Sequence, residues 1–381
     1  MHGIEKSQVK MKTPTVLARV LFAVLTAFVT LAGMTGTADA QNVRPPDNAV
    51  TSGGPPQIVP EEQGNYNIEM WSQLRRGVNG TVSIPDKKAG ILVDSSGENW
   101  RALRNGPLPV YGAYAMAGMI GLLALFFLLR GRIRVEHGFA GRTIERFSDF
   151  ERTGHWLLAT SFIILALTGL NVLYGRYVLL PVIGKEAFAS IALTGKWLHN
   201  YVAFAFMAGL LMTFLTWVSH NFPHPRDLVW LLKGGGLFGG GHPDAKKFNG
   251  GQKILFWLVM IGGFSLSLSG LQLLLPYDLP LFAKTFSILN TFGLDLPTQL
   301  TANEEQQLAT TWHGIVALGL VVVIIAHIYI GSIGMEGAFD AMGSGEVDLN
   351  WAKEHHNLWV EEELAKEASG DGASSRPAPA E

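Results

Sequence analysis

Cysteine is absent from the 381 residues of this sequence. The absence excludes disulfides, thiolate zinc sites, thiolate-bound iron–sulfur clusters and covalent haem attachment through Cys-x-x-Cys-His. Charge is also scarce, because Asp, Glu, Lys and Arg make up 16% of the chain against about 25% in soluble domains. A metal or redox centre held here must use His, Met, Asp or Glu. The net charge of −2 implies no polyanionic partner, and we expect no nucleic-acid binding.

The first 40 residues are typical of a secretory signal peptide. A basic segment ending at Arg19 precedes the apolar run 20–34, and Ala38-Asp39-Ala40 fits a small-x-small cleavage site. An uncleaved anchor helix is the alternative. The segment 41–108 is then an exported extension, in which we expect short strands at 82–85 and 90–93 and docking on a partner or the membrane surface.

Five apolar runs are each long enough to cross about 30 Å of hydrocarbon as an α-helix. They lie near 110–129, 155–174, 197–219, 254–275 and 312–333. The loops after the first and third runs are rich in Lys and Arg, which predicts that they are cytoplasmic. This orientation leaves the N-terminal region in the periplasm and the C-terminal tail in the cytoplasm of a multi-pass bacterial inner-membrane protein.

The expected fold class is an all-α membrane protein, a four-helix bundle with one extra N-terminal transmembrane helix. We expect a signal peptide (1–40), a periplasmic extension (41–108), an extra transmembrane helix (109–130), a cytoplasmic loop (131–153), a four-helix core (154–335) and a cytoplasmic tail (336–381).

Four histidines lie within or at the ends of these predicted spans. His313 and His327 are 14 residues apart on the last span, a rise of ~21 Å with both side chains on roughly one side. The predicted topology places His199 at the depth of His313, near the outer face, and His155 at the depth of His327, near the inner face. An ionisable residue inside an apolar span is a functional candidate by default.

Two bis-histidine sites at different depths are what two stacked b-type haems require, since each iron takes an axial imidazole from either side. A proton path or a metal transporter is the competing interpretation. A proton path or metal transporter requires carboxylates within the spans, and the predicted cores of the second to fifth spans contain none. Glycines inside spans, among them Gly209 and Gly319, permit close approach to a porphyrin or, more simply, to another helix.

The remaining polar candidates carry weaker signals. We expect His220 and His224 at the membrane interface. We expect surface or docking roles in cytoplasmic segments for His137, His242, His355 and His356. Interfacial snorkelling is the simplest explanation for most of the cations near the inner site, although they could balance haem carboxylates; these are Arg142, Arg146, Arg152 and Lys253.

A series of short motifs occurs in order between residues 145 and 362. They are Glu151-Arg152-Thr153-Gly154-His155-Trp156, Lys196-Trp197-Leu198-His199, Asn221-Phe222-Pro223 with Asp227 and Trp230-Leu231-Leu232, Lys247-Phe248-Asn249-Gly250-Gly251-Gln252-Lys253, His313-Gly314, His327-Ile328-Tyr329 and Trp351-Ala352-Lys353-Glu354-His355-His356. Together they resemble the gamma (cytochrome b) subunit of respiratory formate dehydrogenase, in a long form with an N-terminal extension. The series is specific, although no single motif is.

The resemblance implies a four-helix cytochrome b carrying two haems b. The haem ligands are then His199 with His313 on the periplasmic side and His155 with His327 on the cytoplasmic side. It also implies two partners, an alpha subunit that oxidises formate and an iron–sulfur beta subunit that passes electrons inward. Quinone would be reduced near the inner haem, in contact with Asn249 and His327.

Two other functions remain open at this point. One is a cytochrome b subunit of another quinone-linked complex, such as nickel–iron hydrogenase or thiosulfate reductase, which shares the multi-histidine architecture. Only the loop motifs at Asn249 and His355-His356 favour formate dehydrogenase over it. The other is a haem-free membrane anchor or transporter.

Overall fold

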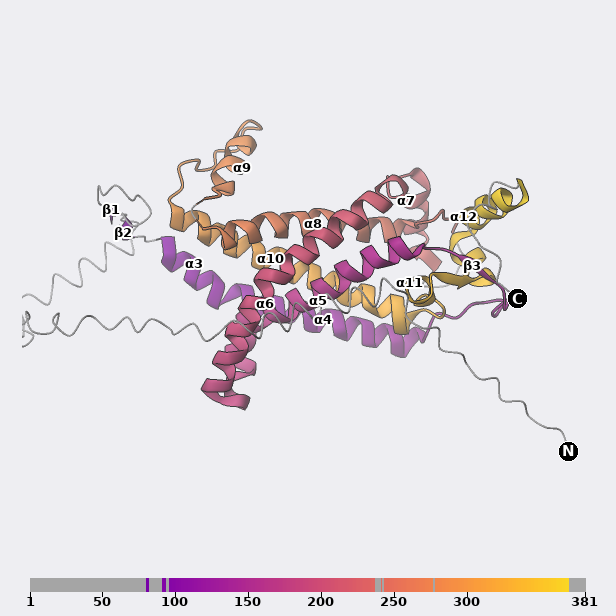
Figure 1. Ribbon diagram of the computed structural model, residues 1–381, viewed down its shortest axis with the longest axis horizontal. Helices are drawn as coiled ribbons and strands as arrows, with labels where there is room; N and C mark the ends of the chain where they lie inside the picture. The colour runs from indigo at the N-terminus through magenta and orange to yellow at the C-terminus, as the bar shows by residue number, and fades with distance from the viewer. Residues whose placement is uncertain are drawn as a thin grey trace, which may run out of the picture. The chain divides into compact units, whose positions relative to one another are not determined.

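The structure is a computed structural model that describes residues 80–81, 91–93, 96–236, 241, 243–276 and 278–369. The predicted signal peptide (1–40) and the strand at 82–85 lie outside these residues. Within them, five helices are long and apolar enough to cross a membrane (Figure 1). The predicted all-α membrane class with five spans is confirmed.

Within the described part of the chain helices dominate, and two small antiparallel sheets accompany them. The five long helices are α4 (Pro107–Arg130), α5 (Asp149–Val178), α6 (Leu180–Trp217), α8 (Gly250–Leu274) and α10 (Ala302–Tyr329). The shorter helices are α3 (Ser96–Asn105), α7 (Pro225–Leu232), α9 (Leu281–Asn290), α11 (Asp340–Gly343) and α12 (Leu349–Ser369). The paired strands are β1 (Gly80–Thr81) with β2 (Ile91–Val93), and β3 (Thr143–Glu145) with β4 (Glu346–Asp348). The strand predicted at 90–93 is therefore present as β2.

Several long helices begin earlier than hydropathy alone indicates, because polar residues form their first turns. Capping boxes start α5, α8 and α10, with Ser148, Asn249 and Thr301 as the N-caps. The third span also differs from its predicted start at residue 197. Its helix α6 begins at Leu180 and bends at Gly184, where φ is 80°. The segment expected to be a loop between the second and third spans is thus helical.

Long helices that follow one another along the chain mostly lie next to one another in the bundle. Close contacts join α5 to α6, α6 to α8, α8 to α10, and α10 to α4. At the first of these contacts a Cβ on Gly209 would lie 2.7 Å from the backbone nitrogen of Leu158, so this glycine permits helix packing. Around Gly319 nothing lies within 4 Å of the corresponding position.

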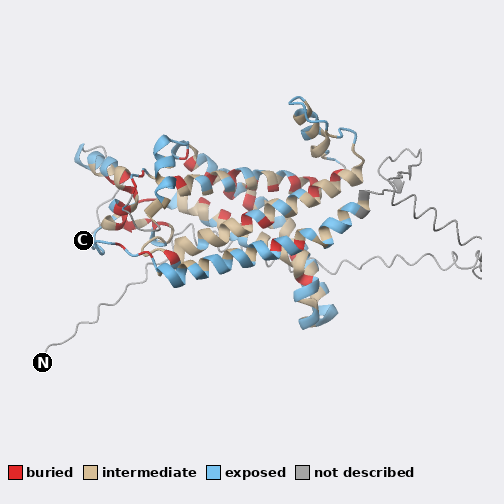
Figure 2. Cartoon of the chain, turned by 180° about the vertical axis from the view of Figure 1, so that it is seen from behind, coloured by how far each residue is buried: buried red, intermediate tan, exposed pale blue. Residues whose placement is uncertain are grey.

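The additional helix α4 is joined to the bundle by specific contacts. The hydroxyl of Tyr174 on α5 donates to the carbonyl of Pro109 at 2.8 Å, and Gly112 lies against Leu318 of α10. The other faces of α4 expose large apolar side chains, such as Leu128 at 80% exposure. All five long helices carry exposed large apolar side chains, and Figure 2 shows many exposed residues along them. Such a surface fits contact with lipid.

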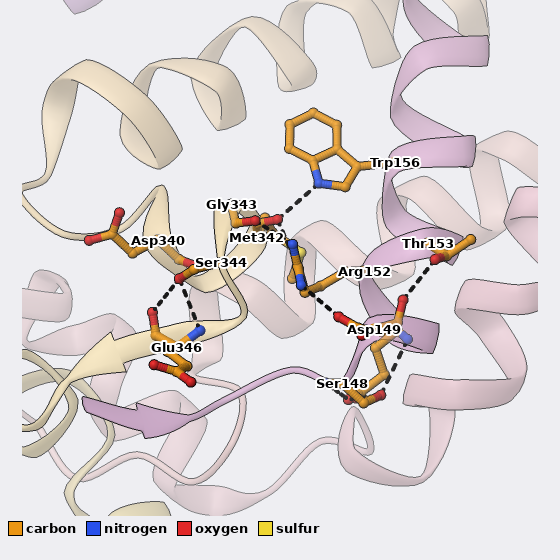
Figure 3. Close-up of polar contacts among 11 residues, drawn as sticks. Ser148, Asp149, Arg152, Thr153, Trp156, Asp340, Met342, Gly343, Ser344 and Glu346 are labelled. Atoms are coloured by element: carbon orange, nitrogen blue, oxygen red, sulfur yellow. Dashed lines mark hydrogen bonds and ion pairs between the residues drawn. The ribbon is translucent and has the colours of Figure 1, made fainter. Parts of the chain in front are cut away.

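A compact layer outside the long helices, which we call the C-terminal cap, consists of residues 131–148, 243–249 and 335–369. Here β3 pairs with β4, and Ile133 forms a parallel bridge with Met335. Many of the fully buried residues gather in this cap (Figure 2). Arg152 and Trp156 on α5 hold it to the bundle, since both donate to the carbonyl of Met342, at 3.2 and 2.9 Å (Figure 3).

The interior of the cap is built around Arg146 and His356, and the structure contradicts a snorkelling position for Arg146 and a surface position for His356. Arg146 is 3% exposed and does not snorkel, and His356 is 1% exposed and does not lie on a surface. Arg146 donates to the carbonyl of Lys247 at 2.7 Å and to the Nε2 atom of His356 at 2.9 Å. Its guanidinium also lies 5.1 Å from the ring centre of Phe147 and of Trp359. Aromatic faces stabilise the buried cation where water is excluded.

The protonation of this pair follows from its contacts. The Nδ1 atom of His356 lies 2.7 Å from the carbonyl of Lys246, which can only accept, so Nδ1 carries the hydrogen and Nε2 accepts from Arg146. Burial, and then the charge of Arg146, lower the pKa of His356 well below its usual value. Burial lowers the pKa of Arg146 to about 9, with Glu151 opposing, so the guanidinium stays charged at neutral pH.

Docking of α12 should weaken as the pH falls below about 6.5. His356 stays neutral while α12 is docked, whereas in the undocked state it binds a proton near pH 6.5. The contribution of neutral His356 to the docking free energy is therefore fully present above pH 6.5 and is lost as the pH falls below it. The loss is at most about 1.4 kcal/mol per pH unit. Amide hydrogen exchange in α12, corrected for intrinsic rates, measures it.

The groups whose charges act on the pKa of His356 are Arg146 and His355. His137 instead pairs with Glu354, elsewhere in the cap. His356→Gln keeps an amide donor and acceptor but cannot titrate, so it should flatten the pH dependence. His137→Gln is the matched control and should retain it. An unchanged slope in His356→Gln would refute this assignment.

Candidate functional site

Two pairs of histidines face each other inside the bundle. The ring centres of His155 on α5 and His327 on α10 are 6.2 Å apart, and we call these two residues the cap-side pair. The ring centres of His199 on α6 and His313 on α10 are also 6.2 Å apart, and we call these the far-side pair. Helix α10 therefore contributes one imidazole to each pair, and two different helices supply the second.

The spacing within each pair fits a metal ion held between two imidazoles. Two metal–nitrogen bonds of about 2 Å each, with about 1 Å from each nitrogen to its ring centre, give about 6 Å. Among the described residues no three His, Asp or Glu side chains gather into a metal site. Each pair supplies only two donors, so a porphyrin that brings four nitrogens of its own fits this donor set.

Hydroxyl groups fix the orientation of the far-side imidazoles. The Oγ1 atom of Thr168 on α5 lies 2.8 Å from Nδ1 of His199, and the Oγ atom of Ser269 on α8 lies 2.9 Å from Nδ1 of His313. Each hydroxyl also donates its one hydrogen to a helix carbonyl, from Thr168 to Ile164 at 2.8 Å and from Ser269 to Ser265 at 2.9 Å.

A hydroxyl has a single hydrogen, so each one accepts from the histidine, and we assign the imidazole hydrogen to Nδ1. The Nε2 lone pair of both far-side histidines is then free for a metal. The residue after each hydroxyl is a glycine, Gly169 or Gly270, and a Cβ there would lie within 3.5 Å of the imidazole Cε1. This hydroxyl–glycine pair, repeated on two helices, is a sequence signal that the histidine pattern alone does not reveal.

The cap-side pair has different surroundings. The Nδ1 atom of His155 is buried and has no hydrogen-bond partner in the described part of the chain. Tryptophans flank the ring, with ring centres 5.3 Å away for Trp156 and 6.3 Å away for Trp217. A buried polar atom without a partner needs an explanation, and a bound group that orients the ring provides one.

A polar cleft reaches from the cap toward this pair. It has a volume of about 880 Å³, and its lining includes Glu151, His220 and Lys247. Glu151 accepts from Lys247 at 2.6 Å and from the indole of Trp217 at 2.9 Å. The Trp217 ring also lies beside His155, so contacts through Glu151 and Trp217 connect the lining of the cleft to the cap-side pair.

The other predicted residues have mainly local contacts. Asn249 caps α8, and its Oδ1 accepts from the backbone of Gln252 at 2.9 Å. His224 caps α7, and Lys253 pairs with Asp227 at 2.8 Å. Among the described residues, the Asn249 side chain forms its hydrogen bond through Oδ1, so its amide group is available to a ligand.

A buried carboxylate lies at the far end of α10, in a segment predicted from hydropathy to be a loop. Glu305 is 4% exposed and accepts from the backbone nitrogens of Phe282 and Ala283 at 3.0 and 2.7 Å, and from Gln272 at 2.6 Å. It therefore caps the start of α9 and holds that helix against the far end of the bundle. The contact is structural and lies eight residues before His313.

Comparisons with known proteins agree with this architecture. A family described as prokaryotic cytochrome b561 matches residues 146–345, a span that contains all four histidines and more than half of the chain. The chain is 31% identical over 223 residues to the cytochrome b556(fdo) subunit of formate dehydrogenase from Escherichia coli K12, covering 58% of this chain and 93% of that protein.

Two further relatives have the same description. The nitrate-inducible cytochrome b556(Fdn) subunit of E. coli K12 is 27% identical over 237 residues, covering 61% of this chain and 98% of the relative. The cytochrome b556 subunit of formate dehydrogenase from Haemophilus influenzae is 27% identical over 226 residues, covering 58% and 83%. The chain therefore belongs to the prokaryotic cytochrome b561 family, as a membrane-embedded cytochrome b subunit of the formate dehydrogenase type.

Proposed function

We propose that this chain anchors a formate dehydrogenase in the bacterial inner membrane and connects it to quinone. Electrons would arrive from a periplasmic iron–sulfur (beta) subunit, pass through two b haems and reduce quinone at the cytoplasmic side. Formate would be oxidised by a separate alpha subunit. The observation that carries the proposal is the two histidine pairs of equal spacing, both within the matched family region.

In this proposal His199 and His313 hold the periplasmic haem, and His155 and His327 hold the cytoplasmic haem. A b haem with two axial imidazoles supplies a one-electron couple and has no open position for oxygen. The chain itself excludes water with its apolar helices and orients the imidazoles through Thr168 and Ser269. The equal ring spacing supports the same ligation at both pairs.

The proposed orientation rests on the distribution of charge. Basic residues concentrate at the end of α4 and on the segment between α4 and α5, at Arg130, Arg132, Arg134, Arg142 and Arg146. Short basic loops favour the cytoplasmic side, and this rule supports a cytoplasmic position for the C-terminal cap. Quinone reduction at the cap-side pair then needs protons from that side, and the polar cleft beside Glu151 offers them a path.

This arrangement moves negative charge inward against the membrane potential. Each electron that crosses works against about 2.3 kcal/mol per 100 mV. The far-side haem must therefore have a sufficiently lower reduction potential than the quinone couple for transfer to proceed.

Formate added to the purified complex should reduce both haem signals, and the histidine variants should divide into two classes. His199→Ala and His313→Ala each lose the same signal, because each removes an axial ligand of one haem. His155→Ala and His327→Ala lose the other. Reduced-minus-oxidised spectra with haem quantification measure both effects, and His220→Ala, outside the pairs, is the control.

Loss of different haems in His199→Ala and His313→Ala would contradict the pairing. Reduction by hydrogen but not by formate would instead assign the chain to another quinone-linked complex. Copurification of alpha and beta subunits is the accompanying observation.

Asn249→Asp should lower quinone reduction about 2- to 10-fold while haem content and the stability of α8 stay unchanged. Aspartate is as good an N-cap as asparagine, but it cannot donate a hydrogen bond of about 0.5–1.5 kcal/mol to a quinone oxygen. Gln252→Glu, which changes the other half of the same capping box, is the matched control. Wild-type quinone kinetics in Asn249→Asp would remove Asn249 from the proposed quinone site.

A further inference from the structure

The two histidine pairs differ in what their Nδ1 atoms contact. Both far-side histidines have a hydroxyl within 2.9 Å of Nδ1, from Thr168 and from Ser269. By contrast, Nδ1 of His155 in the cap-side pair is buried without a partner among the described residues. The same ligand type is therefore in two different environments at two depths of one bundle.

The two hydroxyls at the far-side pair are held in defined positions. Ser269 is 3% exposed, and both hydroxyls are fixed in place by a second hydrogen bond to a helix carbonyl. They come from two helices, α5 and α8, whereas the far-side histidines are on α6 and α10. A hydroxyl held in this way can only accept from the imidazole, so it favours the tautomer that leaves Nε2 free.

Hydrogen bonding at the second nitrogen changes how an imidazole binds a metal. When the N–H group of a ligating histidine donates to an acceptor, the ring becomes a more basic ligand. A more basic axial ligand favours the oxidised iron and lowers the reduction potential, and hydrogen bonding around the ligand is one of the recognised controls on haem potentials. Two such bonds act together at the far-side pair.

We infer that Thr168 and Ser269 are positioning residues that hold the far-side imidazoles in the Nδ1–H form and lower the reduction potential of the haem bound between them. The inference rests on the proposed function, because it requires a b haem at each pair. Its consequence is directional: a lower potential at the far side favours electron transfer toward the cap side, against the membrane potential.

The test uses the full-length protein, purified as the complex, with Thr168→Val and Ser269→Ala. Valine has nearly the shape of threonine but accepts no hydrogen bond. Thr160→Val and Ser267→Ala are matched controls on the same two helices. Among the described residues, the Thr160 hydroxyl bonds only to the helix carbonyls of Trp156 and Leu157, and the Ser267 hydroxyl only to that of Gly263. Thr168→Ser and Ser269→Thr retain the hydroxyl and serve as rescue variants.

Potentiometric titration of the haem absorption bands provides the main measurement. We expect each hydroxyl deletion to raise the midpoint potential of one haem, the one that His199→Ala removes, and the double variant to raise it further. The controls and rescue variants should keep the wild-type value. Every tenfold change in the reduced-to-oxidised ratio of this haem corresponds to about 59 mV.

Selective loss of the far-side haem in a deletion variant, with retention in its rescue variant, also supports a positioning role. Unchanged potentials with both haems present would overturn the inference, as would a shift confined to the cap-side haem. Absence of haem from the wild-type protein would instead overturn the proposed function, so the two failures are distinguishable.

Discussion

An imidazole inside an apolar helix bundle loses its hydrogen bonds to water, and the rest of this structure depends on how those bonds are replaced. At the far-side pair, Thr168 and Ser269 replace one bond of each ring, and the two Nε2 atoms remain available. At the cap-side pair, His155 is enclosed by Trp156 and Trp217 with its Nδ1 atom unsatisfied within the described residues. In both pairs the ring centres are 6.2 Å apart. The same spacing between imidazoles therefore constrains how α5 and α6 are placed relative to α10.

Contacts with the C-terminal cap also hold the surroundings of the cap-side pair in place. Trp156, next to His155, donates to Met342 of the cap, and Trp217, whose ring is also near His155, donates to Glu151. Glu151 in turn binds Lys247, whose carbonyl receives the buried Arg146. A continuous set of contacts therefore joins the cap-side pair to the Arg146–His356 interior. Such contacts hold the first turn of α5 in place, and with it the start of the cap-side site.

The sequence predicts the membrane class, the number of spans and the residues of both pairs, because hydropathy and the 3.6-residue period are local properties. It does not predict the early starts of α5 and α10, although Ser148 with Glu151 and Thr301 with Glu304 carry the capping-box pattern. Arg146 and His356 look like surface residues, since their burial is created by β3, α12 and the 243–249 segment, which are distant in sequence. The sequence does not predict the contacts of Thr168 and Ser269 for the same reason, because each hydroxyl contacts a histidine on another helix.

Each of the two histidine pairs is proposed to hold one b haem, and the functional proposals all depend on this ligation. The most direct measurement is the amount of haem b per chain in the purified full-length protein, from the pyridine haemochrome spectrum and quantitative amino-acid analysis. We expect two haems per chain, with two components resolved in a redox titration. A single haem per chain, or none, in protein that retains its helical content would contradict the proposed ligation.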